Sequence, residues 1–464
     1  MKKYPMTGGA VVVAGLLLFA RGVRPGSGPE SVVSAQADNW TTDVARKYGV
    51  RLLETRDPKG APAYPVNPGD LLFFTNTGTG YGAKNTRNAV VVINARTRKP
   101  IGISGLDPAW SDKFVSHGIG VSPDAKYVYL PAIAPRAASN PGSVLVLDAR
   151  TLKIAQIITS PGQTPHHVKI YEDATGKPRM LVEEFNWHGS GGGTLVSRAD
   201  AGQGFYVLDP SDNNKVVAGM ALGEVRGTIY TCFAAPDGRY LYCSIPGPDV
   251  RNSIRGHGYL AKVDMQSWKL VESLPMGAYP LWTAFTQDNN WAWISNSGDN
   301  KAVKIQRATG PGQVDKVVGD VPTGGGPYGL RMNVDDTEVW VADKGEGQAV
   351  RGSTVTVIDA VGNKAKQTIK TDCIVNDHII LSPDGQEMWA TCNESHEIVV
   401  INAKTYGIEA RIPMPNQGDV HGGSFVAYRA GQGGVAGETV SDISGLHGSA
   451  LAAARKKILW VQGK

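Results

Sequence analysis

Cysteine is scarce in this chain, and its spacing excludes two common kinds of metal site. Only 4 cysteines occur among 464 residues. There is no Cys-x-x-Cys-His motif, which excludes covalently attached c-type haem, and no paired spacing typical of zinc. Cys232 and Cys243 flank the turn at Asp237-Gly238 symmetrically. We expect them to face each other across two antiparallel strands, either as a disulfide or as two buried thiols.

Charge is also sparse and evenly spread. Charged residues make up 19% of the chain, and the net charge is only +5. No Lys/Arg run or base-stacking motif is present, which argues against a nucleic-acid partner. At most, the weak positive charge favours a small anionic substrate.

Long apolar runs are missing, apart from a short one near the N-terminus. Gly9 to Ala20 follows Lys2 and Lys3 and precedes the small-x-small sequence Ala35-Gln36-Ala37. This order is typical of an export signal, and the run is short for a membrane span. We therefore expect a signal peptide over 1–37, an N-terminal extension over 38–69, and a periplasmic protein with no membrane span after processing. An uncleaved anchor is the alternative.

Glycine and proline, by contrast, are abundant, with 57 and 28 residues. Turn sequences such as Ser122-Pro123-Asp124, Ala235-Pro236-Asp237-Gly238 and Ser382-Pro383-Asp384-Gly385 separate pairs of apolar runs. Equivalent positions recur at intervals of about 50 residues, and further strands end in an Asx residue, as at Val144–Asp148. Four strands per repeat indicate an all-β fold, a seven-bladed β-propeller with four-stranded blades. Unrelated β-sandwich domains are the alternative.

The ends of the repeat region suggest how the ring closes. The first blade begins near Asp70 and lacks its innermost strand, which His421–Tyr428 would supply from the C-terminal side. Such closure removes open sheet edges. We assign 70–428 to the propeller and 429–464 to a C-terminal tail, which we expect to lie over the top face.

Most of the 9 histidines fall at equivalent positions of the repeat. Those just ahead of an innermost strand are His117, His166, His167, His378 and His421, whereas His188, His257 and His396 fall in loops and His447 in the tail. Because innermost strands converge on the axis, the first group is expected to meet there, as a polyhistidine metal site requires. The alternative is that each histidine only binds the backbone of a neighbouring blade.

Other chemistry is expected on the same face. Lys84 lies in a glycine-rich loop and could hold an anion, while Glu183, Glu184 and Asp249 could accept a proton. Nitrogen-rich ligation without thiolates suits copper, zinc or iron, and for an exported protein without a haem motif copper fits best.

These features together resemble the nitrous oxide reductase propeller and, more closely, the thiocyanate dehydrogenase family. The resemblance rests on an exported propeller with histidines at blade entries, including the pair His166-His167. It covers the propeller and the tail. Tyr, Trp and Tyr replace histidine in blades four to six, which departs from nitrous oxide reductase.

The resemblance implies a copper-dependent oxidoreductase that converts thiocyanate to cyanate and sulfur and passes two electrons to an external acceptor, such as a c-type cytochrome. It implies a multinuclear centre of up to three copper ions and a homodimer as a further expectation. The implied copper ligands are His117, His166, His167, His378, His421 and His447, and the implied catalytic residues are Lys84, Glu184 and Asp249.

Two other functions remain open from the sequence. A cytochrome d1-like propeller would hold a non-covalent tetrapyrrole on one of the same histidines. A non-catalytic periplasmic binding or scaffold propeller would use the histidines structurally.

Overall fold

Nearly all regular elements are β-strands in the part of the chain that the computed structural model describes, and they form seven sheets. The described residues are 50–78, 89–105, 115–133, 142–159, 165–184, 203–221, 229–246, 257–310 and 312–462. All paired strands run antiparallel, and five of the sheets have four strands in sequence order. The prediction of a β-propeller is confirmed. No helix in this part of the chain is long and apolar enough to cross a membrane.

The five four-stranded sheets follow one another along the chain. They are β10 (Pro165–Glu172), β11 (Pro178–Glu184), β12 (Gln203–Asp209) and β13 (Lys215–Ala221); β14 (Thr231–Ala234), β15 (Tyr240–Ile245), β16 (Gly258–Asp264) and β17 (Lys269–Gly277); β18 (Pro280–Phe285), β19 (Trp291–Asn296), β20 (Lys301–Gln306) and β21 (Lys316–Pro322); β22 (Pro327–Met332), β23 (Glu338–Asp343), β24 (Thr354–Asp359) and β25 (Lys364–Lys370); and β26 (Asn376–Leu381), β27 (Glu387–Cys392), β28 (Glu397–Asn402) and β29 (Ile408–Pro413). A 3₁₀ turn, Pro210–Asp212, joins β12 to β13.

Two larger sheets combine segments from different parts of the chain. One contains β5 (Val115–Ser116), β6 (Gly120–Val121), β7 (Tyr127–Ile133), β8 (Ser143–Asp148) and β9 (Ile154–Thr159), with β1 (Arg51–Thr55) at its outer edge. The other contains β2 (Leu71–Gly78), β3 (Ala89–Asn94), β4 (Lys99–Gly105), β30 (Asp419–Val420), β31 (Ser424–Gly431), β32 (Gly434–Asp442) and β33 (Gly445–Leu446), followed by α4 (Gly448–Gln462). The predicted N-terminal extension thus contributes a strand.

Burial falls from the first strand to the last in the four-stranded sheets. β22 and β26 are buried at every position, whereas β25 and β29 are exposed or half-buried at all but one. A strand covered on both faces requires a continuous apolar run, and an outer strand does not. The first strands therefore lie innermost. We call their N-terminal ends the entry end and their C-terminal ends the exit end.

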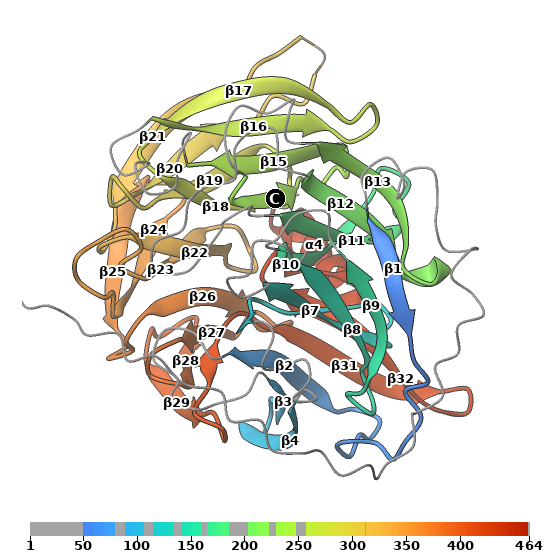
Figure 1. Cartoon of the computed structure of the whole chain (residues 1–464). Helices are drawn as coiled ribbons and strands as arrows, with labels where there is room; N and C mark the ends of the chain where they lie inside the picture. The colour runs from blue at the N-terminus through green and yellow to red at the C-terminus, as the bar shows by residue number, and fades with distance from the viewer. Residues whose placement is uncertain are drawn as a thin grey trace, which may run out of the picture. The chain divides into compact units, whose positions relative to one another are not determined.

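The sheets contact one another in a closed series. β2 contacts β5, and β7 of the same sheet as β5 contacts β10. The innermost strands β10, β14, β18, β22 and β26 then contact one another in that order, and β27 contacts β30, which returns to the sheet of β2. Leu71 of β2 pairs with Ala427 of β31, so the two ends of the repeat region share one sheet. In Figure 1 the blue β2 and the red β31 lie side by side. This confirms the predicted closing strand.

The C-terminal tail takes a different path from the one predicted. β32 pairs with β31, and β32 and the residues just after it reach the other sheets from the exit end. Thr439 Oγ1 donates to Ser122 O, Ser441 Oγ to Leu381 O and Ser444 Oγ to Ile170 O. The tail therefore fills the centre of the ring below the blade entries and does not cover the top face. The difference arises because β32 turns back antiparallel beside β31 and so brings the tail to the exit end.

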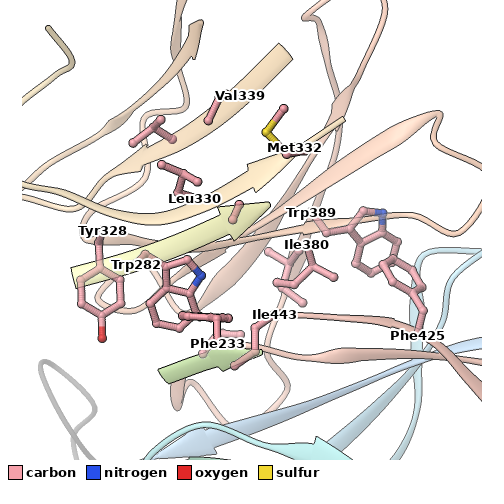
Figure 2. Packing of buried hydrophobic residues seen from close by; sticks show 14 of the residues in the cluster. Phe233, Trp282, Tyr328, Leu330, Met332, Val339, Ile380, Trp389, Phe425 and Ile443 are labelled. Carbon is pink, nitrogen blue, oxygen red and sulfur yellow. The ribbon is translucent and has the colours of Figure 1, made fainter. Parts of the chain in front are cut away.

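An apolar core occupies the centre of the ring, between the entry and exit ends. Figure 2 shows Trp282 beside Tyr328, with Phe233 and the tail residue Ile443 next to them. Ile443 is buried, as are the three aromatic residues. The tail thus contributes to the hydrophobic core of the ring itself.

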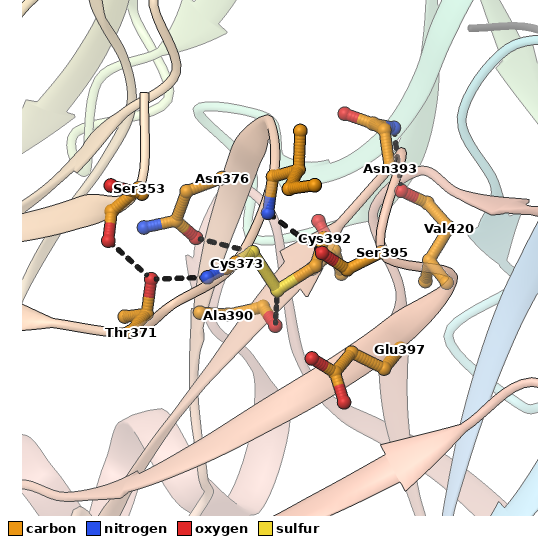
Figure 3. Close-up of a disulfide and its surroundings, with 12 residues drawn as sticks. Ser353, Thr371, Cys373, Asn376, Ala390, Cys392, Asn393, Ser395, Glu397 and Val420 are labelled. Carbon is orange, nitrogen blue, oxygen red and sulfur yellow. Dashed lines mark hydrogen bonds between the residues drawn. A yellow bond between two sulfur atoms is a disulfide. The ribbon is translucent and has the colours of Figure 1, made fainter. Parts of the chain in front are cut away.

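Two disulfides are present. Cys232 and Cys243 are directly opposite in β14 and β15, with Cα atoms 4.0 Å apart, which answers the question left open by the sequence. The second, Cys373–Cys392, was not predicted. Figure 3 shows it beside Asn376 and Asn393, at the entry end of β26.

Candidate metal centre

Five histidines from four sheets converge at the entry end. The ring centroids of His117 and His421 lie 3.8 Å apart, those of His166 and His167 3.9 Å, and those of His378 and His421 4.8 Å. The ring centroid of His117 also lies 4.4 Å from that of His166, which connects His117, His378 and His421 to His166 and His167. The predicted meeting of these five side chains is therefore observed, and we call them the histidine cluster.

Each histidine lies where the innermost strand is interrupted. The register slips between Pro165 and Val168 in β10, and between Asn376 and Ile379 in β26. His117 lies between β5 and β6, and His421 between β30 and β31. A bulge or break interrupts the alternation of side chains between the two faces of the sheet. Neighbouring residues such as His166 and His167 can therefore both point to the centre.

Two glycines allow the rings to pack closely. Gly118 has φ of +83°, and a Cβ there would lie 2.8 Å from His167 Cδ2. Gly422 has φ of +75°, and a Cβ would lie 3.3 Å from His378 Cδ2. Only glycine adopts this backbone region without strain. The His-Gly pairs at 117–118 and 421–422 thus serve the site itself.

Two of the histidines are fixed through an Nδ1 that donates to an oxygen. His166 Nδ1 lies 2.9 Å from Tyr230 O, and His167 Nδ1 lies 2.8 Å from Glu183 Oε1. His421 Nδ1 instead accepts from Asn393 Nδ2 at 3.1 Å, with Asp377 Oδ2 also 3.1 Å away. In His166 and His167 the proton lies on Nδ1, and Nε2 keeps a lone pair. Metal-binding histidines in proteins are held in this way.

Several ring nitrogens of the cluster are buried and have no hydrogen bond to any residue that the structure describes. These are Nε2 of His117, His167 and His421 and both nitrogens of His378. A buried polar atom without a partner is costly, and such atoms commonly mark a missing ion or water. His378 Nε2 does lie 3.3 Å from Asp377 Oδ2, although the geometry is not that of a hydrogen bond.

Possible ligand atoms gather in three overlapping groups. Within each group they lie within 4.8 Å of one another: His117, His167 and His421; His166, His167 and Glu183; and Asp377, His378 and His421. His167 and His421 each belong to two groups, which links the three into one continuous site. This donor set, rich in imidazole and free of thiolate, fits copper or zinc.

Burial keeps the imidazoles neutral. It lowers the pKa of His117, His167, His378 and His421 well below the usual value, and that of His166 less strongly because Glu183 opposes it. Neutral imidazole is the form that binds a metal ion.

Two buried lysines neutralise the carboxylates beside the histidines. Lys169 Nζ donates to Glu183 Oε2 at 2.7 Å, and Lys344 Nζ lies 2.9 Å from Asp377 Oδ1. Cys232 N also donates to Glu183 Oε2. The site therefore has one hydrogen-bonded Lys–carboxylate–His chain, which ends at His167, and a second Lys–carboxylate pair that lies beside His421. Burial nevertheless raises the pKa of Asp377 to about 6, against the opposing charge of Lys344.

Aromatic side chains enclose the cluster on the side without histidine. The ring of Trp282 lies 4.6 Å from that of His378 and 5.2 Å from that of His167. Tyr230 lies 5.1 Å from His166, and its hydroxyl donates to the hydroxyl of Tyr328 at 3.3 Å. All three aromatic residues are buried, so this wall limits water access to the histidines.

The remaining predicted site residues have different outcomes. Glu184 is buried at the end of β11, opposite Pro165, whereas its neighbour Glu183 contacts the cluster. Lys84 and Asp249 lie outside the described residues. Their predicted catalytic roles stay predictions.

His447 requires a correction. Its Nε2 lies 2.8 Å from Asp442 Oδ1, its N–H donates to Val440 O, and it lines a cavity at the exit end. Among the described residues it belongs to none of the three ligand groups. The path of the tail is the physical reason, because it approaches the ring from the exit end.

The sequence interpretation missed Lys169 and Lys344. A signal for the first was present, because Lys169 interrupts the apolar run of an innermost strand, where a charge must be paired. Lys344 follows β23 and has no comparable signal, since its partner Asp377 belongs to the next sheet.

Comparisons with known proteins identify the fold. No family model matches, and no curated protein sequence matches. The periplasmic gluconolactonase PpgL of Pseudomonas aeruginosa is 14% identical, with 77% of this chain and 99% of that chain covered and a TM-score of 0.54. A putative 6-phosphogluconolactonase of Bacteroides fragilis is 12% identical, with 74% and 94% covered and a TM-score of 0.52.

A third solved structure, the dihydro-heme d1 dehydrogenase NirN in complex with DHE, is 15% identical with 79% and 77% covered. Its TM-score of 0.47 is too low to support an inference. At these identities the comparisons establish similarity of fold alone: this chain shares the β-propeller fold.

Proposed function

We propose that this chain is a periplasmic copper oxidoreductase, a seven-bladed propeller that oxidises a small anion. The observation that carries the proposal is that buried His166 and His167 are held through Nδ1, while Nε2 of His117, His167 and His421 has no hydrogen bond to any described residue. A structural staple would use its ring nitrogens on the backbone, whereas a metal ligand leaves one free.

Copper would be held by His117, His166, His167, His378 and His421, with up to three ions. Five imidazoles exceed the needs of one ion, and the three overlapping ligand groups favour a multinuclear centre. When bound, copper would supply a Lewis acid and an acceptor of electrons.

Thiocyanate is the proposed substrate, on the family resemblance. The balanced reaction is SCN⁻ + H₂O → OCN⁻ + S + 2H⁺ + 2e⁻, in which carbon loses its bond to sulfur and gains one to oxygen. The electrons go to an external acceptor such as a c-type cytochrome. A positive charge at Lys84 would orient the anion, and Glu184 or Asp249 would accept a proton.

The protein's own residues have defined tasks in this scheme. Glu183 orients His167, and Asn393 orients His421. Lys169 and Lys344 neutralise the carboxylates of Glu183 and Asp377, and the aromatic wall at Trp282 excludes water. Such preorganisation fixes the geometry of the site before substrate binds.

The direct test of function is turnover by the copper-loaded protein. We expect thiocyanate to yield cyanate, with two electrons delivered to a dye acceptor for each molecule consumed. His117→Ala should lower this rate at least a hundredfold, and His257→Ala, which removes an exposed histidine, should leave it unchanged. No cyanate from a fully loaded protein would refute thiocyanate as the substrate.

A further inference from the structure

A second polar site lies at the exit end, apart from the histidine cluster. A cavity of about 120 Å³ is bounded by β10, β14, the end of β22, and the tail from Ser444 to Arg455. This space can hold several water molecules. Lys169 lines it and also binds Glu183, so one buried ion pair separates the cavity from the histidine cluster.

The notable residue in this wall is Arg331, near the end of β22. It is only 4% exposed, and its Nη1 donates to Ile443 O at 3.1 Å. Within the described part of the chain, none of the ion pairs includes Arg331, although Asp336 and Asp442 act on it from a longer distance. Burial lowers the pKa of Arg331 to about 10, so it is charged at neutral pH. A buried charge without a close counter-charge is costly.

The acidic groups nearby are already engaged or partly neutral. Asp442 Oδ1 accepts from Ser444 and lies 2.8 Å from His447 Nε2. Asp336 Oδ2 accepts from Gln287 N, and burial raises the pKa of Asp336 to about 7. A carboxyl that is partly protonated at neutral pH opposes an anion less than a full negative charge would. Glu172 is the remaining acid in the wall.

The cavity itself provides the space for a counter-ion, because Arg331 is one of the residues that line it. Gly445 packs beside the guanidinium, where an added Cβ would lie 3.4 Å from Arg331 Nη1. Arg455 adds a second positive charge to the wall, and Lys169 contributes none because Glu183 neutralises it. We propose that the exit-end cavity binds a small oxyanion or carboxylate that pairs with Arg331. The planar fork of arginine matches such groups with two parallel hydrogen bonds.

The test uses sulfate and formate as probes in isothermal titration calorimetry. Titrations are made at constant ionic strength with EDTA, so that no metal in the histidine cluster can bind the anion. We expect saturable binding of one anion per chain. Arg331→Met should raise the dissociation constant at least tenfold, and Arg331→Lys should have an intermediate effect because the charge remains without the fork. Lys456→Met removes the same charge from an exposed position of α4 and should leave binding unchanged.

Thermal unfolding gives a second readout that does not depend on heats of binding. The midpoint of the wild-type protein should rise with millimolar sulfate or formate, and this rise should be absent in Arg331→Met. Sulfate also stabilises proteins generally, but that effect is common to both proteins. Absence of saturable binding to the wild type, or equal affinity of Arg331→Met, would overturn the proposal. If Arg331→Met does not fold, the same comparison is made with Arg331→Lys.

Discussion

At the residue scale, the glycines and the carboxylates beside the histidines matter as much as the histidines. Gly118 and Gly422 let neighbouring rings approach, while Glu183 selects which nitrogen of His167 carries the proton. A substitution at any of these positions changes the site without removing a ligand.

Gly118→Ala should destabilise the protein and weaken metal binding. The positive φ costs about 1 kcal/mol for a residue with a Cβ, and contact with His167 adds about 1–2 kcal/mol. Chemical denaturation measures the loss, and competition with a chelator measures copper affinity. Gly176→Ala is the matched control, since Gly176 has φ of +77° but nothing within 4 Å of an added Cβ. Equal losses in the two variants would show that His167 is not constrained by Gly118.

Glu183→Gln should weaken copper binding by about 10–100-fold, because the amide orients His167 less strongly than the carboxylate. It should also cost about 3–5 kcal/mol in the free energy of unfolding, since Lys169 would lose its buried counter-charge. Lys169→Met in the same chain should recover much of the stability but not the copper affinity. Wild-type affinity in Glu183→Gln would contradict an orienting role.

The repeat determines which residues of the site could be predicted from the sequence. The five histidines lie at the strand entry of four repeats, with His166 and His167 as neighbours in one of them, so their meeting could be inferred from turn alignment alone. His447 lies outside the repeat, and its position depends on the path of the tail. Lys344 could not be found, because its contact with Asp377 joins two sheets through side chains that no local pattern relates.

At the element scale, the same irregularity recurs at the entry of successive innermost strands. β18 and β22 also slip in register, between Pro280 and Thr283 and between Pro327 and Leu330. The residues re-aimed there include Trp282 and Tyr328 rather than histidines. The same kind of irregularity at the strand entry thus places both the histidines and the residues of the aromatic wall. Alignment of the repeats within the chain located these positions. It did not locate the bulges, because a bulge depends on how residues pair across strands.

The end of β23 carries a buried carboxyl that links stability to pH. Asp343 Oδ2 accepts hydrogen bonds from Thr354 and Thr356, yet burial raises the pKa of Asp343 to about 7. Because the folded state holds this proton more tightly than the unfolded state, the contribution to stability is present below about pH 4 and lost as pH rises through 7.

Asp343→Asn should therefore remove part of the pH dependence of unfolding. Between pH 5 and pH 8 the wild type should lose about 2–3 kcal/mol more than the variant does. Urea denaturation at the two pH values measures this difference, and the raised pKa values of Asp336 and Asp377 are common to both proteins. Parallel pH profiles would contradict the assignment.

At the scale of the whole molecule, the closing sheet joins the two ends of the repeat region. Phe425 of β31 packs against Phe73 of β2, with ring centroids 4.7 Å apart, and against Trp389 at 5.0 Å. The repeat period predicted this closure. The hairpin β31–β32 and the edge strand β1 could not be predicted, because neither follows the repeat.

Phe425→Ala should cost about 3–5 kcal/mol, as expected for a large side chain removed from a packed core. Urea denaturation measures the effect. Val435→Ala serves as the control, since Val435 of β32 is exposed and should change stability by less than about 0.5 kcal/mol. Similar losses in both variants would mean that the closing contact is not a main source of stability.

The central claim is that the histidine cluster is a multinuclear copper site, and metal content tests it most directly. Elemental analysis after copper loading and desalting should give more than one copper ion per chain. His117→Ala with His421→Ala should reduce this below one, while His257→Ala should not change it. Less than one copper ion per loaded wild-type chain, or an intense Soret band that depends on the same histidines, would contradict the account.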